Sequence, residues 1–166
     1  MKLRQAVART LDRLLKIELL YAHCDVPCGI YDPHQAAVAA KTVHTMNKKV
    51  TELPAPGSSP QEQLEHRNTI IRMVQTKEAH AQLCKQELLI LWTDYFKPEH
   101  LSTFPDLHET FWKAAKLCSD NKQHVDLAKS QELMETVEKI TQMFQKAEAA
   151  KQAATAPKTL QPAGKS

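Results

Sequence analysis

Glycine and aromatic residues are scarce in this chain. Among its 166 residues there are only 3 glycines, and aromatic side chains make up 5% of the total. So little glycine gives no sign of an architecture of strands and tight turns. The hydrophobic share of 42% is enough for one core in a chain of this length. The composition therefore predicts a single, small, all-α domain.

Long apolar runs are also missing. No stretch of 18 apolar residues occurs, which excludes a transmembrane helix and predicts a soluble protein without a membrane partner. Residues 1–22 lack the continuous apolar core of a secretory signal, and the four cysteines form no disulfide framework. We therefore expect a cytoplasmic location. The leucines and arginines of residues 1–22 also suit an organelle transit peptide, although such peptides generally lack acidic residues.

Positive charge is concentrated at the amino terminus. The net charge is +3, and residues 1–22 account for all of that excess, so the remainder of the chain is close to neutral. A nucleic-acid-binding protein would carry a basic patch on its folded part. We therefore expect no nucleic-acid partner.

One short segment brings together two thiols and an imidazole. His23 precedes Cys24, and Cys28 follows after three further residues, with Pro27 restricting the turn before it. Two thiolates this close are usually paired by a metal or by a disulfide. If His23 were the first residue, its α-amine, with a pKa of about 7.7–8.0, would add a nitrogen donor at neutral pH. A planar set of nitrogen and sulfur donors favours Ni(II) or Cu(II) over zinc.

The string from His23 to Pro33 reads HCDxPCGxYDP, and it resembles the metal-binding hook of nickel superoxide dismutase. A second segment supports the resemblance, because residues 91–98, LWTDYFKP, are similar to a signature near the end of that family's second helix. The resemblance implies an enzyme that disproportionates superoxide to O2 and hydrogen peroxide. Its cofactor would be one nickel ion per subunit, cycling between Ni(II) and Ni(III).

The resemblance also implies the ligands and the maturation of the site. The metal ligands would be His23, Cys24 and Cys28, with Pro27 holding a cis turn that aims both sulfurs inward. Residues 1–22 would be a leader that a peptidase removes after Ala22, and the precursor would be inactive because an amide replaces the amine at His23. The family fold is a four-helix bundle that assembles as a homohexamer.

Three further residues are expected to take part in catalysis. Tyr31 and Tyr95 resemble the two tyrosines beside the vacant metal position, where phenols order water, limit access and assist proton delivery. Asp25 lies inside the hook itself. For the tyrosines, ordinary packing with one satisfied hydroxyl is the alternative interpretation.

Two positions depart from the family pattern. A glutamate on the first helix and an arginine on the second, which pair behind the histidine ligand, are replaced here by Ala39 and His80. We hypothesise that His80 approaches the imidazole of His23, directly or through water, because such outer groups orient metal ligands.

Beyond the hook the pattern predicts four helices in an antiparallel bundle. The first begins at Asp32 and Pro33 and ends near Val50, and a proline- and glycine-rich linker occupies residues 52–60. The second is capped by Ser59 with Glu62 and ends near Tyr95. The third and fourth are expected over residues 105–118 and 125–144. The domain would span residues 23–150, with its hook at residues 23–31, and residues 151–166 would form a disordered tail.

Other functions fit the same residues. A nickel carrier or storage protein would need the hook but no redox tuning. In a helical interaction protein, Cys24 and Cys28 would form a disulfide. A zinc site would need four tetrahedral ligands, and only three side chains are local. Cys84 and Cys118 lie in apolar helical patterns, which predicts ordinary buried thiols.

Overall fold

The computed structural model of the protein describes residues 29–155. The predicted leader, the hook residues His23, Cys24, Asp25, Pro27 and Cys28, and the tail beyond residue 155 lie outside this range. The chain divides into two units, Met1–Ile30 and Tyr31–Ser166, and all of the described helices belong to the second.

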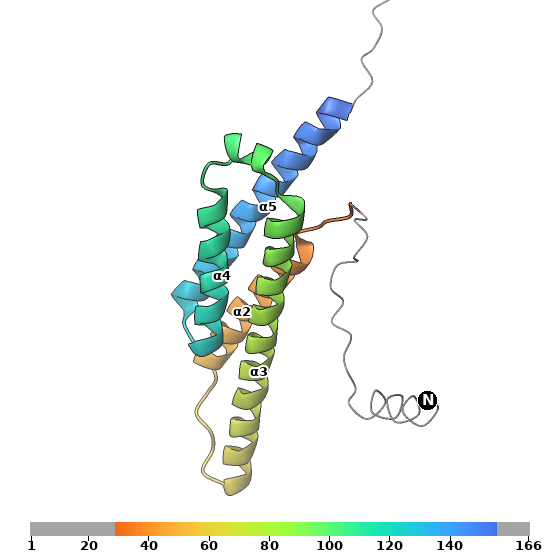
Figure 1. The fold of residues 1–166 in the computed structure, drawn as a ribbon. Coiled ribbons are helices and arrows are strands. Elements are labelled where there is room, and N and C mark those ends of the chain that lie inside the picture. Colours follow the sequence, from red (N-terminus) through yellow and green to blue (C-terminus); the bar gives the residue numbers. More distant parts are fainter. Residues whose placement is uncertain (1–28, 156–166) are drawn as a thin grey trace, which may run out of the picture. The chain divides into compact units, whose positions relative to one another are not determined.

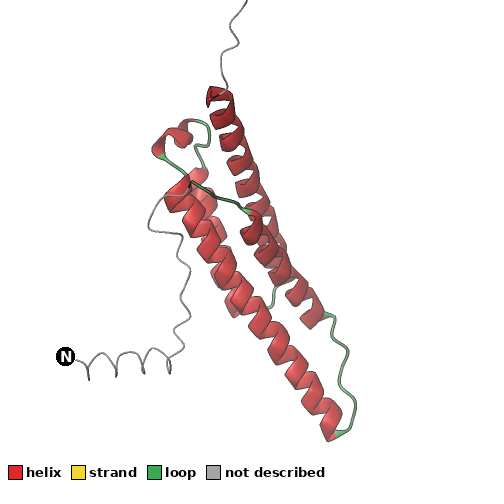
Figure 2. Cartoon of the chain, turned by 90° about the vertical axis from the view of Figure 1, so that its right-hand side faces the viewer, coloured by secondary structure: helices red, strands yellow, loops and turns green. Residues whose placement is uncertain are grey.

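Four long helices make up the second unit (Figure 1). They are α2 (His34–Thr51), α3 (Pro60–Ile90), α4 (Leu107–Gln123) and α5 (Leu127–Thr155). A π-helical turn, η1 (Leu91–Tyr95), continues α3, and a short 3-10 helix, η2 (Pro98–Ser102), precedes α4. Figure 2 shows helices and loops without a strand in the described part of the chain. The prediction of an all-α fold is confirmed.

Neighbouring helices run in opposite directions. Between α3 and α4, Lys85 donates to Ser119 at 3.0 Å, and Gln82, one turn earlier on α3, accepts from Lys122, one turn later on α4, at 2.8 Å. The chain alternates in direction in the same way from α2 to α5 (Figure 1). Each helix packs against the next, and α5 returns to α2, which closes the bundle around one core.

The core is formed by apolar side chains from all four helices. Val43, Leu88, Phe111, Leu133 and Ile140 are each at most 1% exposed. Helix α2 contributes mainly small residues to its buried face, which allows the neighbouring helices to approach closely; these are Ala36, Ala39 and Ala40.

Cys84 and Cys118 are buried free thiols, as predicted. They lie on α3 and α4, and a hydrogen bond to Cys118, together with burial, raises the pKa of Cys84 well above its usual range. The Cys84 thiol therefore remains protonated at neutral pH.

The helix starts follow the predicted capping residues. Ser59 Oγ accepts the backbone N–H of Glu62 at 3.2 Å, and the Glu62 carboxylate accepts the backbone N–H of Ser59 at 3.1 Å, so the capping box is confirmed. Asp32 accepts the N–H of His34 at 2.8 Å. Helix α2 begins at His34, one residue later than expected, because Pro33 occupies the capping position.

The last two helices extend beyond their predicted ends. Helix α4 reaches Gln123, and α5 continues to Thr155, into the segment for which disorder was expected. Residues 147–154 are rich in alanine, the residue that most favours helix, and Lys151 pairs with Glu148 at 3.3 Å. The absence of apolar periodicity in this segment was therefore a poor indicator of disorder.

One cation is buried where α3 passes the end of α4. Lys77 is 2% exposed and donates to the carbonyl oxygen of His124 at 2.7 Å. Burial lowers the pKa of its ammonium group. A cation here satisfies carbonyl groups that the end of α4 leaves unpaired.

No helix of residues 29–155 is long and apolar enough to cross a membrane.

Candidate active site

The structure brings the two predicted tyrosines together. Tyr31 lies just before α2 and Tyr95 is the last residue of η1, yet their ring centroids are 5.5 Å apart in an edge-to-face arrangement with an interplanar angle of 62°. Tyr31 is half-buried and Tyr95 is 9% exposed. Edge-to-face contact at this distance is a favourable aromatic geometry. The last residue of the predicted hook, Tyr31, is thus in contact with the signature that follows α3.

The position of Tyr95 depends on a change in helix geometry. The N–H of Phe96 donates to the carbonyl oxygen of Leu91 at 3.0 Å, which is the five-residue spacing of a π-helix. Phe96 and Lys97 then leave the helix in an extended conformation before Pro98 opens η2, and the end of this helix near Tyr95 agrees with the prediction. π-Helical turns are rare and occur often at functional sites.

An aromatic cluster holds this segment against the bundle. Tyr95 lies 4.9 Å from Phe96 and 4.5 Å from Phe144 of α5, measured between ring centroids. Phe96 contacts Phe111 of α4 at 5.5 Å, and Trp92 stacks on Phe111 at 5.8 Å with an interplanar angle of 9°. The aromatic residues of the second signature therefore anchor it to α4 and α5.

The hydroxyl of Tyr95 has a carboxylate partner that the sequence did not identify. It donates to Glu148 Oε1 at 2.9 Å, and Lys151 Nζ lies 3.3 Å from the same oxygen. Burial and the hydrogen bond to Glu148 raise the pKa of Tyr95 above its usual range, so the phenol is protonated across physiological pH. Glu148 comes four residues after Phe144, so the two lie on the same face of the helix. An acidic residue on an otherwise apolar helix face is the sequence feature that could have identified Glu148.

The two departures from the family pattern lie on helices that pack together. Ala39 of α2 is fully buried and His80 of α3 is half-buried. His80 Nδ1 lies 2.9 Å from the carbonyl oxygen of Thr76. Since a carbonyl only accepts, Nδ1 carries the hydrogen of this contact. The imidazole is therefore oriented by its own helix.

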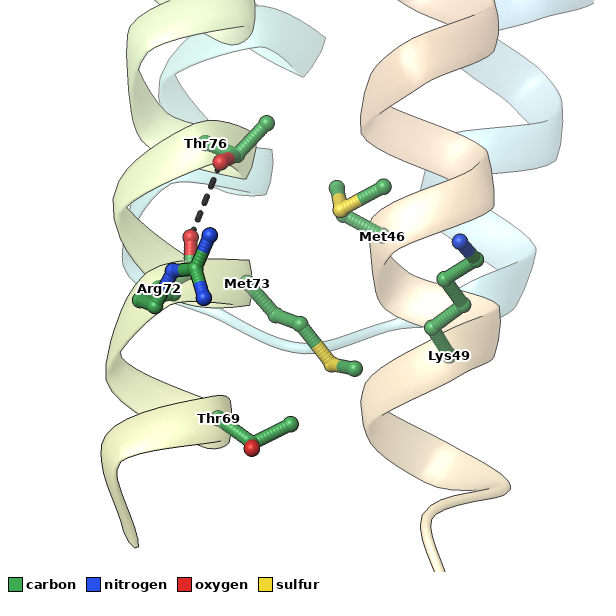
Figure 3. A pocket seen from close by; sticks show the side chains of 6 residues that line it. All are labelled: Met46, Lys49, Thr69, Arg72, Met73 and Thr76. Carbon is green, nitrogen blue, oxygen red and sulfur yellow. Dashed lines mark hydrogen bonds between the residues drawn. The ribbon is translucent and has the colours of Figure 1, made fainter. Parts of the chain in front are cut away.

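A surface pocket places these two positions relative to each other (Figure 3). Met46 of α2 and Met73 of α3 line a cavity of about 250 Å³, and the side chain of Met73 extends toward α2. Ala39 and His80 lie two helical turns further along the two antiparallel helices, in the same direction from the pocket. They therefore belong to one level of the α2–α3 interface. The remaining lining residues are Lys49, Thr69, Arg72 and Thr76.

The described residues contain no cluster of three or more histidine, cysteine, aspartate or glutamate side chains that could hold a metal ion. The predicted ligands His23, Cys24 and Cys28, and with them Asp25 and Pro27, lie outside residues 29–155.

Comparison with known proteins gives one consistent result. Residues 19–148 match the family described as nickel-containing superoxide dismutase. Proteins named superoxide dismutase [Ni] from Streptomyces seoulensis and Streptomyces coelicolor are 36% and 38% identical over 123 residues, which is 74% of this chain and 86% of each relative. The crystal structure of a nickel-containing superoxide dismutase with ligation corresponding to the oxidized state superposes with a TM-score of 0.63 at 34% identity, covering 76% of this chain and 99% of that one.

Proposed function

The chain belongs to the nickel-containing superoxide dismutase family, and we propose that His23, Cys24 and Cys28 bind the metal with which it disproportionates superoxide. As a member of that family it is an oxidoreductase that takes superoxide as its substrate. The contact between Tyr31 and Tyr95 is the observation that supports this proposal most directly. Tyr31 belongs to the first family motif and Tyr95 to the second, and the two motifs are far apart in the sequence.

The chemistry of the donor set fits nickel. The thiolates of Cys24 and Cys28, the α-amine of His23 and the backbone nitrogen of Cys24 would hold nickel, with the His23 imidazole as a further ligand, and anionic sulfur would favour the oxidised metal. Nickel, when bound, supplies one-electron redox chemistry to both half-reactions. The protein's task is to keep both thiols deprotonated and to hold them in one short turn, for which Pro27 is suited.

The tyrosines are proposed to control access and protons. Their rings meet edge to face, and two adjacent phenols can order water and restrict entry to small molecules. Reduction of superoxide to hydrogen peroxide consumes two protons, so ordered water beside the site is required. Asp25 is proposed to assist from within the hook.

Maturation is proposed to begin with cleavage after Ala22. Only a free amine at His23 supplies the nitrogen donor that the uncleaved chain lacks, so a leader peptidase would switch the enzyme on. We also propose a cytoplasmic location, which the lack of a continuous apolar segment in residues 1–22 supports.

We further propose assembly as a homohexamer, as the family resemblance implies. Several large apolar side chains on the described surface support association with other copies, since such groups gain from burial. They include Leu64, Ile71 and Trp112, which are 57%, 55% and 59% exposed.

His80 is proposed to orient the imidazole of His23 in place of the missing glutamate. Its Nδ1 hydrogen is held by the carbonyl oxygen of Thr76, which leaves Nε2 as the ring nitrogen for a second partner. His80→Ala should change the spectrum of the oxidised metal and the turnover at equal nickel loading. Unchanged values for both would reject this role.

The experiment that tests the function compares two forms of the chain. One retains residues 1–22, and the other is cleaved to begin at His23. Both are loaded with nickel anaerobically, and metal content and superoxide consumption are measured on the same samples. We expect one nickel per subunit and activity in the cleaved form, and no activity in the form with the leader.

Cys24→Ser and Cys28→Ser provide the ligand controls, and Cys118→Ser tests a thiol outside the hook. Loss of nickel in the first two variants with retention in the third would support the assigned ligands. Nickel binding without superoxide consumption in the cleaved parent would instead support a carrier or storage protein.

A further inference from the structure

The hydrogen bond between Tyr95 and Glu148 determines the direction of a phenol hydrogen. A phenol has one hydrogen to donate, and an ionised carboxylate can only accept. Since Tyr95 donates to Glu148 Oε1 at 2.9 Å, that hydrogen points away from any other partner. The phenol oxygen then offers only its lone pairs to molecules on its remaining side.

We propose that Glu148 is a positioning residue of the active site, which holds the Tyr95 hydroxyl so that its oxygen accepts hydrogen bonds from water or hydrogen peroxide. This inference rests on the proposed function, in which Tyr95 lies beside the metal. In this arrangement Tyr95 does not act as a proton donor in the reaction, because its hydrogen is directed at Glu148. Superoxide is an anion without hydrogens, so an accepting oxygen favours the protonated product and water over the substrate.

The carboxylate is held in place from its own helix. Phe144, one turn earlier on α5, packs against the Tyr95 ring at 4.5 Å, and Ala147 beside Glu148 is only 7% exposed. Lys151 Nζ lies 3.3 Å from Glu148 Oε1, and the Glu148 side chain is 28% exposed. Contacts on both sides of Glu148 thus keep it at the phenol, while Lys151 compensates its charge.

Glu148 is also placed at the end of the region shared with the family. The family match ends at residue 148, whereas α5 continues to Thr155 and includes Lys151. The helical extension beyond the match therefore supplies the cation that pairs with Glu148. A structural clamp that only fixes the end of α5 is the competing explanation.

The protonation of Tyr95 can be read directly in the metal-free protein. The chain has 3 tyrosines, and Tyr21 is lost with the leader, so the cleaved Tyr31→Phe variant retains Tyr95 alone. Its tyrosinate absorbance then titrates a single phenol. Adding Glu148→Ala should lower the pKa of Tyr95 toward the ordinary value of about 10. An unchanged titration would overturn the proposal.

Activity distinguishes positioning from a clamp. At equal nickel loading, Glu148→Ala should lower kcat/KM by about two- to tenfold, the effect of one lost hydrogen bond. Glu148→Gln retains an acceptor and should recover most of this loss. In a Tyr95→Phe background, Glu148→Ala should have no further effect, because the residue acts through the phenol.

Glu138→Ala on the exposed face of α5 is the matched control, since its partner is Gln142. If the losses of kcat/KM from Glu148→Ala and Tyr95→Phe multiply in the double variant, Glu148 acts independently of the phenol, as a clamp would, and the proposal is refuted. A loss of kcat/KM in Glu138→Ala equal to that in Glu148→Ala would refute it as well. If the parent enzyme binds nickel but consumes no superoxide, the proposed function fails. The titration would still report whether Glu148 holds the hydroxyl.

Discussion

Phe111 should contribute more to stability than any exposed aromatic residue of α4. Its side chain is 1% exposed and lies between Trp92, stacked at 5.8 Å, and Phe96 at 5.5 Å. Replacing a buried phenylalanine by alanine typically lowers the free energy of unfolding by about 3–5 kcal/mol, because apolar burial is lost and a cavity remains. Two aromatic contacts of roughly 0.5–1.5 kcal/mol each place Phe111 in the upper half of that range.

We therefore expect Phe111→Ala to lose about 4 kcal/mol, a large share of the roughly 5–15 kcal/mol that stabilises a folded domain. Phe111→Leu restores most of the volume but not the ring contacts, and should lose less than about 1.5 kcal/mol. The matched control is Trp112→Ala, since Trp112 is the next residue but is 59% exposed. Its loss should stay within about 0.5 kcal/mol in the isolated subunit.

The measurement is urea unfolding of the cleaved, metal-free protein, followed by helical circular dichroism at two protein concentrations. A loss at Trp112 that depends on concentration reports subunit contacts rather than the core. Losses below about 1 kcal/mol for Phe111→Ala, or a concentration-independent loss at Trp112 as large as that at Phe111, would refute this account of the aromatic cluster.

Three other predictions use separate features of the bundle. Ser59→Ala should lower the free energy of unfolding by about 1 kcal/mol, measured by urea titration, because it removes a helix cap. Cys84 and Cys118 are fully buried, so a thiol reagent should modify them only after denaturation. The ion pair with Lys139 lowers the pKa of Asp106, so its stabilisation is present above the unfolded value of about 3.9 and lost as pH falls. Asp106→Asn should therefore weaken the acid dependence of stability, and an unchanged acid-unfolding profile would contradict this.

Features set by neighbouring residues were predicted well from the sequence. The capping box of Ser59 and Glu62 depends on groups three residues apart, and it occurs as expected. The contact between Tyr31 and Tyr95 is different, because composition and periodicity do not place these residues together. It was anticipated through the resemblance of two motifs, and the structure shows the rings in contact.

Features that depend on packing between distant helices were missed. Glu148 lies on α5, 53 positions from the tyrosine that it binds, and its place one turn after Phe144 does not by itself connect it to Tyr95. The end of α5 was misplaced for a related reason. Residues 151–155 have no apolar stripe, but alanine, lysine and the pairing of Lys151 with Glu148 favour continued helix.

The π-helical turn makes the backbone conformation of residues 91–95 as important as their residue types. A π turn accommodates one residue more than an α turn. If the same residues wound as a regular α-helix, at about 100° per residue, Tyr95 would lie at a different angle around the axis of α3. Tyr95 would then leave Tyr31 and Glu148 although both partners remained in the sequence. A homologue can therefore retain each aromatic residue of the signature and still lack the site if this one turn is not π-helical.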